Sequence, residues 1–337
     1  MLYAVTLLQA GAYTEQMDNL AHTLAGIAIG EAGLKRMTTL GTATLIIASN
    51  FPDIDAAALF FGDEVNMFVV RRGWTHGILA LIVLPFVLAG IMLAWDRFVR
   101  RRLHANPEPA SPVGLLVLAA VGIWTHTLLD LVNTYGVRLL MPFSERWFYA
   151  DALFVIDPWV WAALTAGIIV ARRRARESTP NPERPARIAV ALVSMYIVVM
   201  AGSSAVGRSI VDAQAVAGAA DRTMVSPVPI DPMRRRIVRD HGTWYEIGNL
   251  TWWPRPRYEA VRITRKGDQF PQAVTAANTE VGAAFLSWAR FPRFDINVGR
   301  AQERVTITDL RYADEGGRGW ATVTIPLRRE WPEGEGR

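Results

Sequence analysis

Four apolar stretches, each close to the length that crosses a lipid bilayer, constrain the fold of this chain more than any other feature. They cover residues 77–95, 113–132, 153–171 and 188–206 of the 337-residue sequence. A helix needs roughly 20 residues to cross the ~30 Å hydrocarbon core of a bilayer, and core helices of soluble proteins are normally shorter. We therefore predict an α-helical multi-span membrane domain embedded in a lipid bilayer.

Two shorter apolar segments precede these stretches. They cover residues 20–34 and 37–50, and Lys35 and Arg36 separate them. At 1.5 Å per residue each helix would reach only about 21–23 Å, less than the hydrocarbon thickness. The pattern predicts either a helical hairpin that dips into the membrane or two short tilted helices.

Arginine clusters predict the orientation of the spans. One cluster, within residues 97–102, follows the first long stretch, and a second, within 172–187, separates the third from the fourth. Loops rich in Lys and Arg stay in the cytoplasm. Because two crossings separate the clusters, both can lie on that side. The polar residues at the opposite ends of the spans, and the segment after the last span, are then extracytoplasmic.

The chain divides by composition into three parts. Residues 1–16 form an N-terminal extension, 17–206 the transmembrane domain, and 207–337 a small β-rich (α+β) soluble domain. Period-two alternation at 261–265, 304–308 and 320–325 predicts strands, and 279–289 a short helix. We expect Trp244, Trp252 and Trp253 in the core of this domain rather than against the lipid surface.

Cysteine is absent and the net charge is +5. The chain therefore has no disulfides or thiolate metal sites, and any metal must take nitrogen and oxygen ligands. Most of the excess charge comes from arginines beside the spans, which membrane topology explains. No nucleic-acid partner is expected.

Histidines and aspartates gather at the ends of the apolar segments, and these residue types together bind divalent metals such as zinc. His126 and Asp130 are four residues apart, so they share one face of a helix. Charged groups beside membrane spans are costly and usually functional. The predicted ligands are His22, Asp53, Asp55, His76, His126 and Asp130, with Asp151 and Asp157 as second choices.

Two of these segments have simpler interpretations. Asp53 and Asp55 follow Pro52 and could be a turn or a helix cap. His76 follows Arg71 and Arg72, which could anchor lipid headgroups. In the functional interpretation, the same arginines lie beside a metal ligand and hold an anionic substrate such as a phosphate.

The chain resembles the membrane-bound metal-dependent hydrolases of the YdjM/YbcI type over roughly residues 17–170. The matching segments are Asp18-x-x-x-His22-x-x-x-Gly26, Asn50-x-Pro52-Asp53-x-Asp55, Arg72-Gly73-x-Thr75-His76, His126-x-x-x-Asp130-x-x-Asn133-Thr134-Tyr135-Gly136, Met141-Pro142-Phe143, and Asp151 followed by Asp157-Pro158. The resemblance implies a hydrolase-like metal site in a multi-pass protein of the bacterial inner (cytoplasmic) membrane. Gly77 replaces the serine usual after Thr-His.

The predicted activity is metal-assisted hydrolysis. The ligand types favour zinc, as one ion or more. A bound divalent ion lowers the pKa of a coordinated water to about 7, and a carboxylate accepts the proton of that water. Asp53 and Asp130 are the candidate bases, and Asn50, Arg72 and Asn133 are candidates for binding substrate. A phosphoester or a lipid-linked small molecule fits the arginine and the membrane. A metal- or ion-handling transporter, and a sensor or scaffold with a structural metal, are the alternatives.

Overall fold

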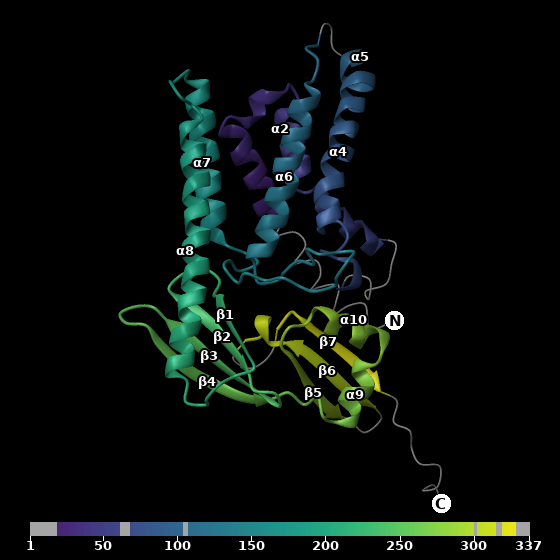
Figure 1. Cartoon of the computed structure of the whole chain (residues 1–337), viewed down its shortest axis with the longest axis vertical. Coiled ribbons are helices and arrows are strands. Elements are labelled where there is room, and N and C mark those ends of the chain that lie inside the picture. Colours follow the sequence, from purple (N-terminus) through teal and green to yellow (C-terminus); the bar gives the residue numbers. More distant parts are fainter. Residues whose placement is uncertain (1–18, 61–67, 104–106, 300–301, 315–318, 328–337) are drawn as a thin grey trace, which may run out of the picture.

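A computed structural model describes residues 19–60, 68–103, 107–299, 302–314 and 319–327. The predicted extension 1–16 and Asp18 lie outside them. Membrane-type helices form one layer, and two antiparallel sheets lie at one end of the helical bundle (Figure 1). The predicted fold class is therefore confirmed.

Among the described residues, three helices are long and apolar enough to cross a membrane. They are α4 (Ile78–Trp95) with its continuation through η3 (Asp96–Arg100) and α5 (Arg101–Leu103), α6 (Pro112–Val132), and α8 (Arg184–Gln214). Half of the most apolar segment of α6 is buried inside the protein, against 22% of the corresponding segments of α4 and α8. The helix α6 is thus the centre of the bundle.

The third predicted span was wrong in its bounds. Residues 153–157 are not helical, and α7 begins only at Pro158, capped by the Asp157 side chain, and ends at Arg176. Arginines begin at Arg172, so the uncharged part of α7 reaches only about 21 Å. This helix runs beside α8 (Figure 1) but is not among the three long apolar helices.

The two short N-terminal segments are separate short helices. A helix covers residues 19–31, and η1 (Leu34–Met37) leads into α2 (Gly41–Ala48). A 3₁₀-helix, η2 (Phe51–Phe60), follows. The helix α2 approaches α6 closely, because a side-chain carbon on Gly122 would lie 2.4 Å from the Ala48 side chain. This packing brings η2 beside α6.

The β-domain (residues 222–327) holds two antiparallel sheets with two short helices. The first sheet has the order β1-β2-β3-β4 and the second β5-β6-β7. The bounds are β1 (Arg222–Pro227), β2 (Arg234–Asp240), β3 (Trp244–Thr251), β4 (Arg257–Arg265), α9 (Pro271–Ala277), α10 (Glu280–Trp288), β5 (Pro292–Val298), β6 (Glu303–Asp309) and β7 (Thr322–Leu327). The predicted strands and the predicted helix at 279–289 are confirmed.

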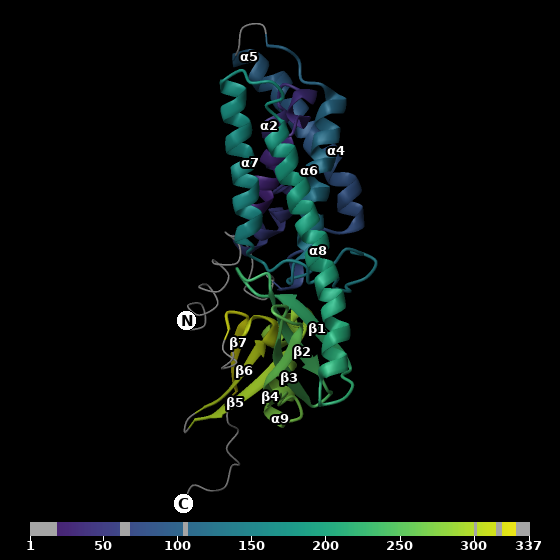
Figure 2. The same cartoon turned by 90° about the vertical axis from the view of Figure 1, so that its left-hand side faces the viewer.

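The helix α8 joins the two layers. It ends at Gln214 rather than at the predicted boundary after 206, and its last turns pack on the first sheet (Figure 2). Val211 lies in one apolar cluster with Val225, Ile237 and Leu250. Because a helix is stiff over this length, the β-domain is held directly against the bundle.

The three tryptophans expected in the core of the β-domain are not buried there. Trp253 is 78% exposed, and Trp244 and Trp252 are only partly buried. The core tryptophan of the β-domain is Trp288, in a cluster with Phe285, Tyr312 and Val323.

Candidate metal centre

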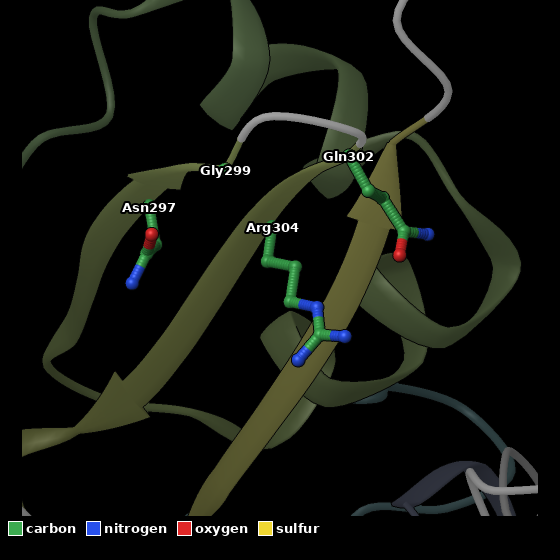
Figure 3. Close-up of a pocket in the computed structure, with 4 residues that line it drawn as sticks. All are labelled: Asn297, Gly299, Gln302 and Arg304. Carbon is green, nitrogen blue, oxygen red and sulfur yellow. The ribbon is translucent and has the colours of Figure 1, made fainter.

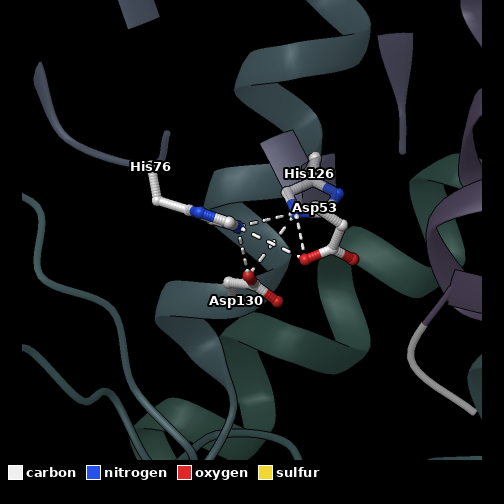
Figure 4. A group of neighbouring side chains, drawn as sticks. All are labelled: Asp53, His76, His126 and Asp130. Carbon is white, nitrogen blue, oxygen red and sulfur yellow. Dashed lines mark hydrogen bonds and ion pairs between the residues drawn. The ribbon is translucent and has the colours of Figure 1, made fainter. Parts of the chain in front are cut away.

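Four predicted ligands meet at the end of the bundle that faces the β-domain. Asp53 comes from η2, His76 from the segment before α4, and His126 and Asp130 from α6 (Figure 4). One ligand atom from each lies within 4.8 Å of the others, and all four residues are buried. We call these residues the cluster; its geometry allows it to hold a metal ion.

The distances within the cluster fit one small ion. The Nε2 atoms of His76 and His126 are 3.0 Å apart. Asp130 Oδ2 lies 3.2 Å from His76 Nε2 and 3.5 Å from His126 Nε2. Asp53 Oδ1 is 3.7 and 3.8 Å from the same nitrogens. Four tetrahedral ligands of one zinc ion stand about 3.3 Å apart, so only small shifts are needed.

The outer hydrogen bonds of the two histidines determine which nitrogen faces the cluster. His126 Nδ1 lies 2.7 Å from the Ser49 carbonyl oxygen, which can only accept, so Nδ1 carries the proton. His76 Nδ1 lies 2.9 Å from Thr75 Oγ1 and 3.4 Å from Asp55 Oδ2. Thr75 donates to that carboxylate, so its oxygen accepts from His76. When both rings are neutral, as metal ligands must be, both Nε2 atoms therefore present lone pairs to the cluster.

The second oxygen of Asp130 contacts one arginine and one histidine. Arg72 Nη2 lies 2.9 Å and His22 Nε2 3.3 Å from Asp130 Oδ1. The ring of His22 also stacks on His126 at 3.8 Å. His22 therefore lies beside the four residues of the cluster and contacts the Asp130 oxygen that Arg72 also contacts.

Asp55 also lies beside the cluster. Its Oδ2 accepts from the Arg72 backbone and from Thr75, at 2.8 and 2.9 Å. Although burial opposes ionisation, the hydrogen bond from His76 keeps the pKa of Asp55 below its usual value. Burial likewise opposes the charge of His76, yet hydrogen bonds to Asp130 and Asp55 raise its pKa to about 9. The surrounding carboxylates thus strongly favour a cation at this place.

The predicted substrate-binding residues form hydrogen bonds with other parts of the protein. Asn50 Nδ2 donates to Thr23 and to the Ile46 carbonyl, linking helix 19–31 to α2. Asn133 Oδ1 accepts from the backbones of Tyr135 and Gly136 and from Arg72 Nη1, at 2.8, 3.3 and 3.3 Å. Asn133 therefore orients Arg72.

The structure does not bring Asp151 and Asp157 into the cluster. Asp151 pairs with Arg290 of the β-domain at 2.8 Å. Asp157 caps α7 and accepts from the Tyr196 hydroxyl at 3.0 Å. Both carboxylates already have protein partners, which makes them structural anchors instead of ligands.

The surroundings of Gly77 explain why glycine stands here in place of the serine that usually follows Thr-His. A side-chain carbon at this position would lie 2.4 Å from the Met141 carbonyl oxygen. Backbone atoms cannot yield as a flexible side chain can, so this chain has no room for a serine hydroxyl beside His76.

A pocket lined by Asn297, Gly299, Gln302 and Arg304 lies at the end of the β5–β6 hairpin (Figure 3). None of the predicted site residues lines it. The cluster, with its titratable groups and ligand geometry, is the stronger candidate site.

The β-domain braces the loop that follows α6. Arg311 is buried and donates to the carbonyl oxygens of Thr134 and Tyr135, at 3.0 and 3.3 Å, and to that of Trp288 at 3.1 Å. Tyr135 packs against Trp288 and under the Arg72 guanidinium. A chain of contacts thus runs from Arg311 through this loop to Arg72 and Asp130. Sequence reasoning missed Arg311, because nothing local links it to a loop 177 residues away.

Replacing Arg311 should loosen the cluster. Arg311→Lys keeps a positive charge beside Asp309 but loses the guanidinium fork that reaches the loop carbonyls. We expect zinc affinity to fall roughly tenfold, the lower end of the range for outer contacts of metal ligands. A competition titration with a fluorescent chelator measures this. Arg293→Lys is the control, since Arg293 pairs with Asp295 of its own strand; equal losses in both variants would contradict the brace.

The sequence is similar to two bacterial proteins. The chain is 23% identical over 167 residues to the uncharacterized protein YfhP of Bacillus subtilis, covering 46% of each chain. It is 29% identical over 107 residues to the inner membrane protein YbcI of Escherichia coli, covering 31% of this chain and 55% of YbcI. These matches span about half the length of the relatives, and no solved structure matches.

The family model described as YdjM inner membrane protein matches residues 17–205, more than half of the chain. The match contains every residue of the cluster and α4, α6 and α7, and it ends within α8, before the β-domain. The chain belongs to the YdjM family of inner membrane proteins.

Proposed function

We propose that this protein is a membrane-bound, zinc-dependent hydrolase that acts on an anionic, lipid-linked phosphoester. The observation that carries the proposal is the pair of Nε2 atoms 3.0 Å apart. With both Nδ1 atoms carrying protons, these nitrogens are two acceptors facing each other in a buried site. Only a shared proton or cation makes that arrangement favourable.

The donor set favours zinc among divalent ions. His76, His126 and Asp130 would supply two imidazoles and one carboxylate, which leaves the fourth tetrahedral position open for a water beside Asp53, and the chain has no cysteine. Magnesium and calcium prefer six or more oxygen ligands, which this cluster does not offer. A divalent ion, when bound, supplies Lewis acidity and lowers the pKa of a coordinated water to about 7.

Asp53 is the better candidate for the proton acceptor. Its Oδ1 lies 3.7 Å from His76 Nε2, against 3.2 Å for Asp130 Oδ2, and it is 3.7 Å from its cationic partner Arg71. Asp130 is fully buried and held by Arg72 and His22, which suits a fixed ligand. A carboxylate that is less constrained can accept a proton and release it again.

Charge around the cluster favours an anionic substrate. With the histidines neutral, as they are when they bind a metal, Asp53, Asp55 and Asp130 face Arg71 and Arg72, which leaves one excess negative charge. A divalent ion reverses that sign, so a phosphoester would be attracted. His126 lies six residues before the end of α6, about 9 Å within the helix. That depth suits a substrate whose headgroup is attached to lipid.

The depth also separates the proposal from transport. A transporter holds its ion near the bilayer midplane, whereas the cluster lies toward one end of the helices, beside the β-domain. A sensor or scaffold with a structural ion would bind metal without turnover, and the following substitutions distinguish this outcome.

Asp53→Asn should abolish turnover while His76, His126 and Asp130 retain the ion. Loss of a general base lowers rates about 10²- to 10⁴-fold. Hydrolysis of bis(p-nitrophenyl) phosphate and of lipid phosphoesters is measured together with bound metal. Asp295→Asn, an exposed carboxylate of the β-domain, is the control. Metal-loaded wild-type protein inactive on all these esters, or a fully active Asp53→Asn variant, would contradict the hydrolase.

The orientation follows from the arginines. Those of α5, the end of α7 and the start of α8 lie at the end of the bundle opposite the β-domain (Figure 1). The positive-inside rule then makes the cluster and the β-domain extracytoplasmic.

Because the chain has no cysteine, single cysteines report the orientation directly. Thr243→Cys, in the exposed turn between β2 and β3, should react with a membrane-impermeant maleimide on intact spheroplasts. Ser178→Cys, after the C-terminus of α7, should react only after lysis. The reverse pattern would overturn the assignment.

A further inference from the structure

Two neighbouring turns of the first sheet expose large apolar side chains. Ile230 and Met233, between β1 and β2, are 67% and 54% exposed, and Trp253, between β3 and β4, is 78% exposed. The turns are adjacent, because the Trp252 backbone N–H donates to the Met233 carbonyl at 2.9 Å. We call Ile230, Met233 and Trp253 the apolar tip.

The apolar tip lies where the membrane helices begin. The indole of Trp159, in the first turn of α7, donates to the Ile230 carbonyl at 2.8 Å. The beginning of β2 also contacts a membrane helix, because the Arg235 side chain donates a hydrogen bond to Ser203 Oγ of α8 at 2.8 Å. The edge of the sheet is therefore level with the end of the bundle, not suspended below it.

The charge pattern of α8 locates the bilayer boundary. No charged residue occurs between Arg187 and Arg208. The uncharged stretch of about 20 residues spans ~30 Å, the thickness of the hydrocarbon core. Ser203, which Arg235 contacts, lies within one and a half turns of Arg208, so the contact is near the boundary.

The composition of the tip suits the interfacial zone of a bilayer. Tryptophan sits at headgroup level in membrane proteins, and arginines there meet lipid phosphates. Arg234, Arg255 and Arg257 flank the tip and are exposed. The apolar surface continues onto the helices, since Trp159 and Val206 are each 54% exposed.

We infer that the apolar tip inserts into the interfacial region of the leaflet on the β-domain side, and that the flanking arginines bind anionic lipid phosphates. Lipid contact explains why three large apolar side chains remain uncovered at this edge. The contact also fixes the height of the β-domain relative to the bilayer. It does not depend on metal binding or on hydrolysis.

Depth-dependent quenching tests the insertion. Trp253→Cys and, separately, Ile230→Cys carry an environment-sensitive fluorophore, and the full chain is placed in bilayers of phosphatidylethanolamine and phosphatidylglycerol. Lipids spin-labelled near the headgroup should quench both sites several times more strongly than Thr243→Cys, in the turn at the opposite end of the sheet. Removing phosphatidylglycerol should weaken quenching, and Arg255→Glu with Arg257→Glu should remove that dependence.

Two results would overturn the inference. Quenching at 230 and 253 no stronger than at 243 would place the tip in water. A blue-shifted signal that depends on protein concentration but not on the spin-labelled lipid would assign the tip to contact between copies of this chain. Using two labelled sites guards against a variant whose turn is locally misfolded.

Discussion

Two histidine nitrogens facing each other in a buried site constrain the rest of this structure. Contacts of His126 with Ser49, and of His76 with Thr75 and Asp55, determine the tautomers of the neutral rings, so both lone pairs point inward, 3.0 Å apart. Without a shared proton or metal ion these acceptors repel each other, and neither is solvated. The carboxylates of Asp53 and Asp130 add negative charge at the same point. The arrangement is stable when positive charge occupies its centre, which is the physical basis of the proposed metal site.

The surrounding layers hold this arrangement in place. Arg72 balances Asp130 and is itself oriented by Asn133 and the loop after α6. Arg311 of the β-domain holds that loop through a hydrogen bond to the Thr134 carbonyl oxygen. A segment outside the family match therefore supports residues inside it. Because α8 runs unbroken between the layers, the support does not rely on a flexible linker.

Much of the architecture and the cluster could be predicted from sequence, because the signals are local. Apolar length predicts α4 and α6, period-two alternation predicts strands, and the four-residue spacing of His126 and Asp130 places them on one helix face. Long-range partners could not be predicted. Asp151 looks like a ligand until Arg290, 139 residues away, is seen to pair with it. The start of α7 was misjudged because hydropathy does not reveal the cap at Asp157.

The most direct test of the central claim is elemental analysis of the detergent-purified protein. The account predicts roughly one zinc ion per chain in the wild type, lost in His76→Ala and in His126→Ala. It predicts retention in His241→Ala, whose histidine pairs with Glu246 in the β-domain. A wild-type protein that stays metal-free after incubation with zinc, or a His76→Ala/His126→Ala double variant with wild-type metal content, would contradict it.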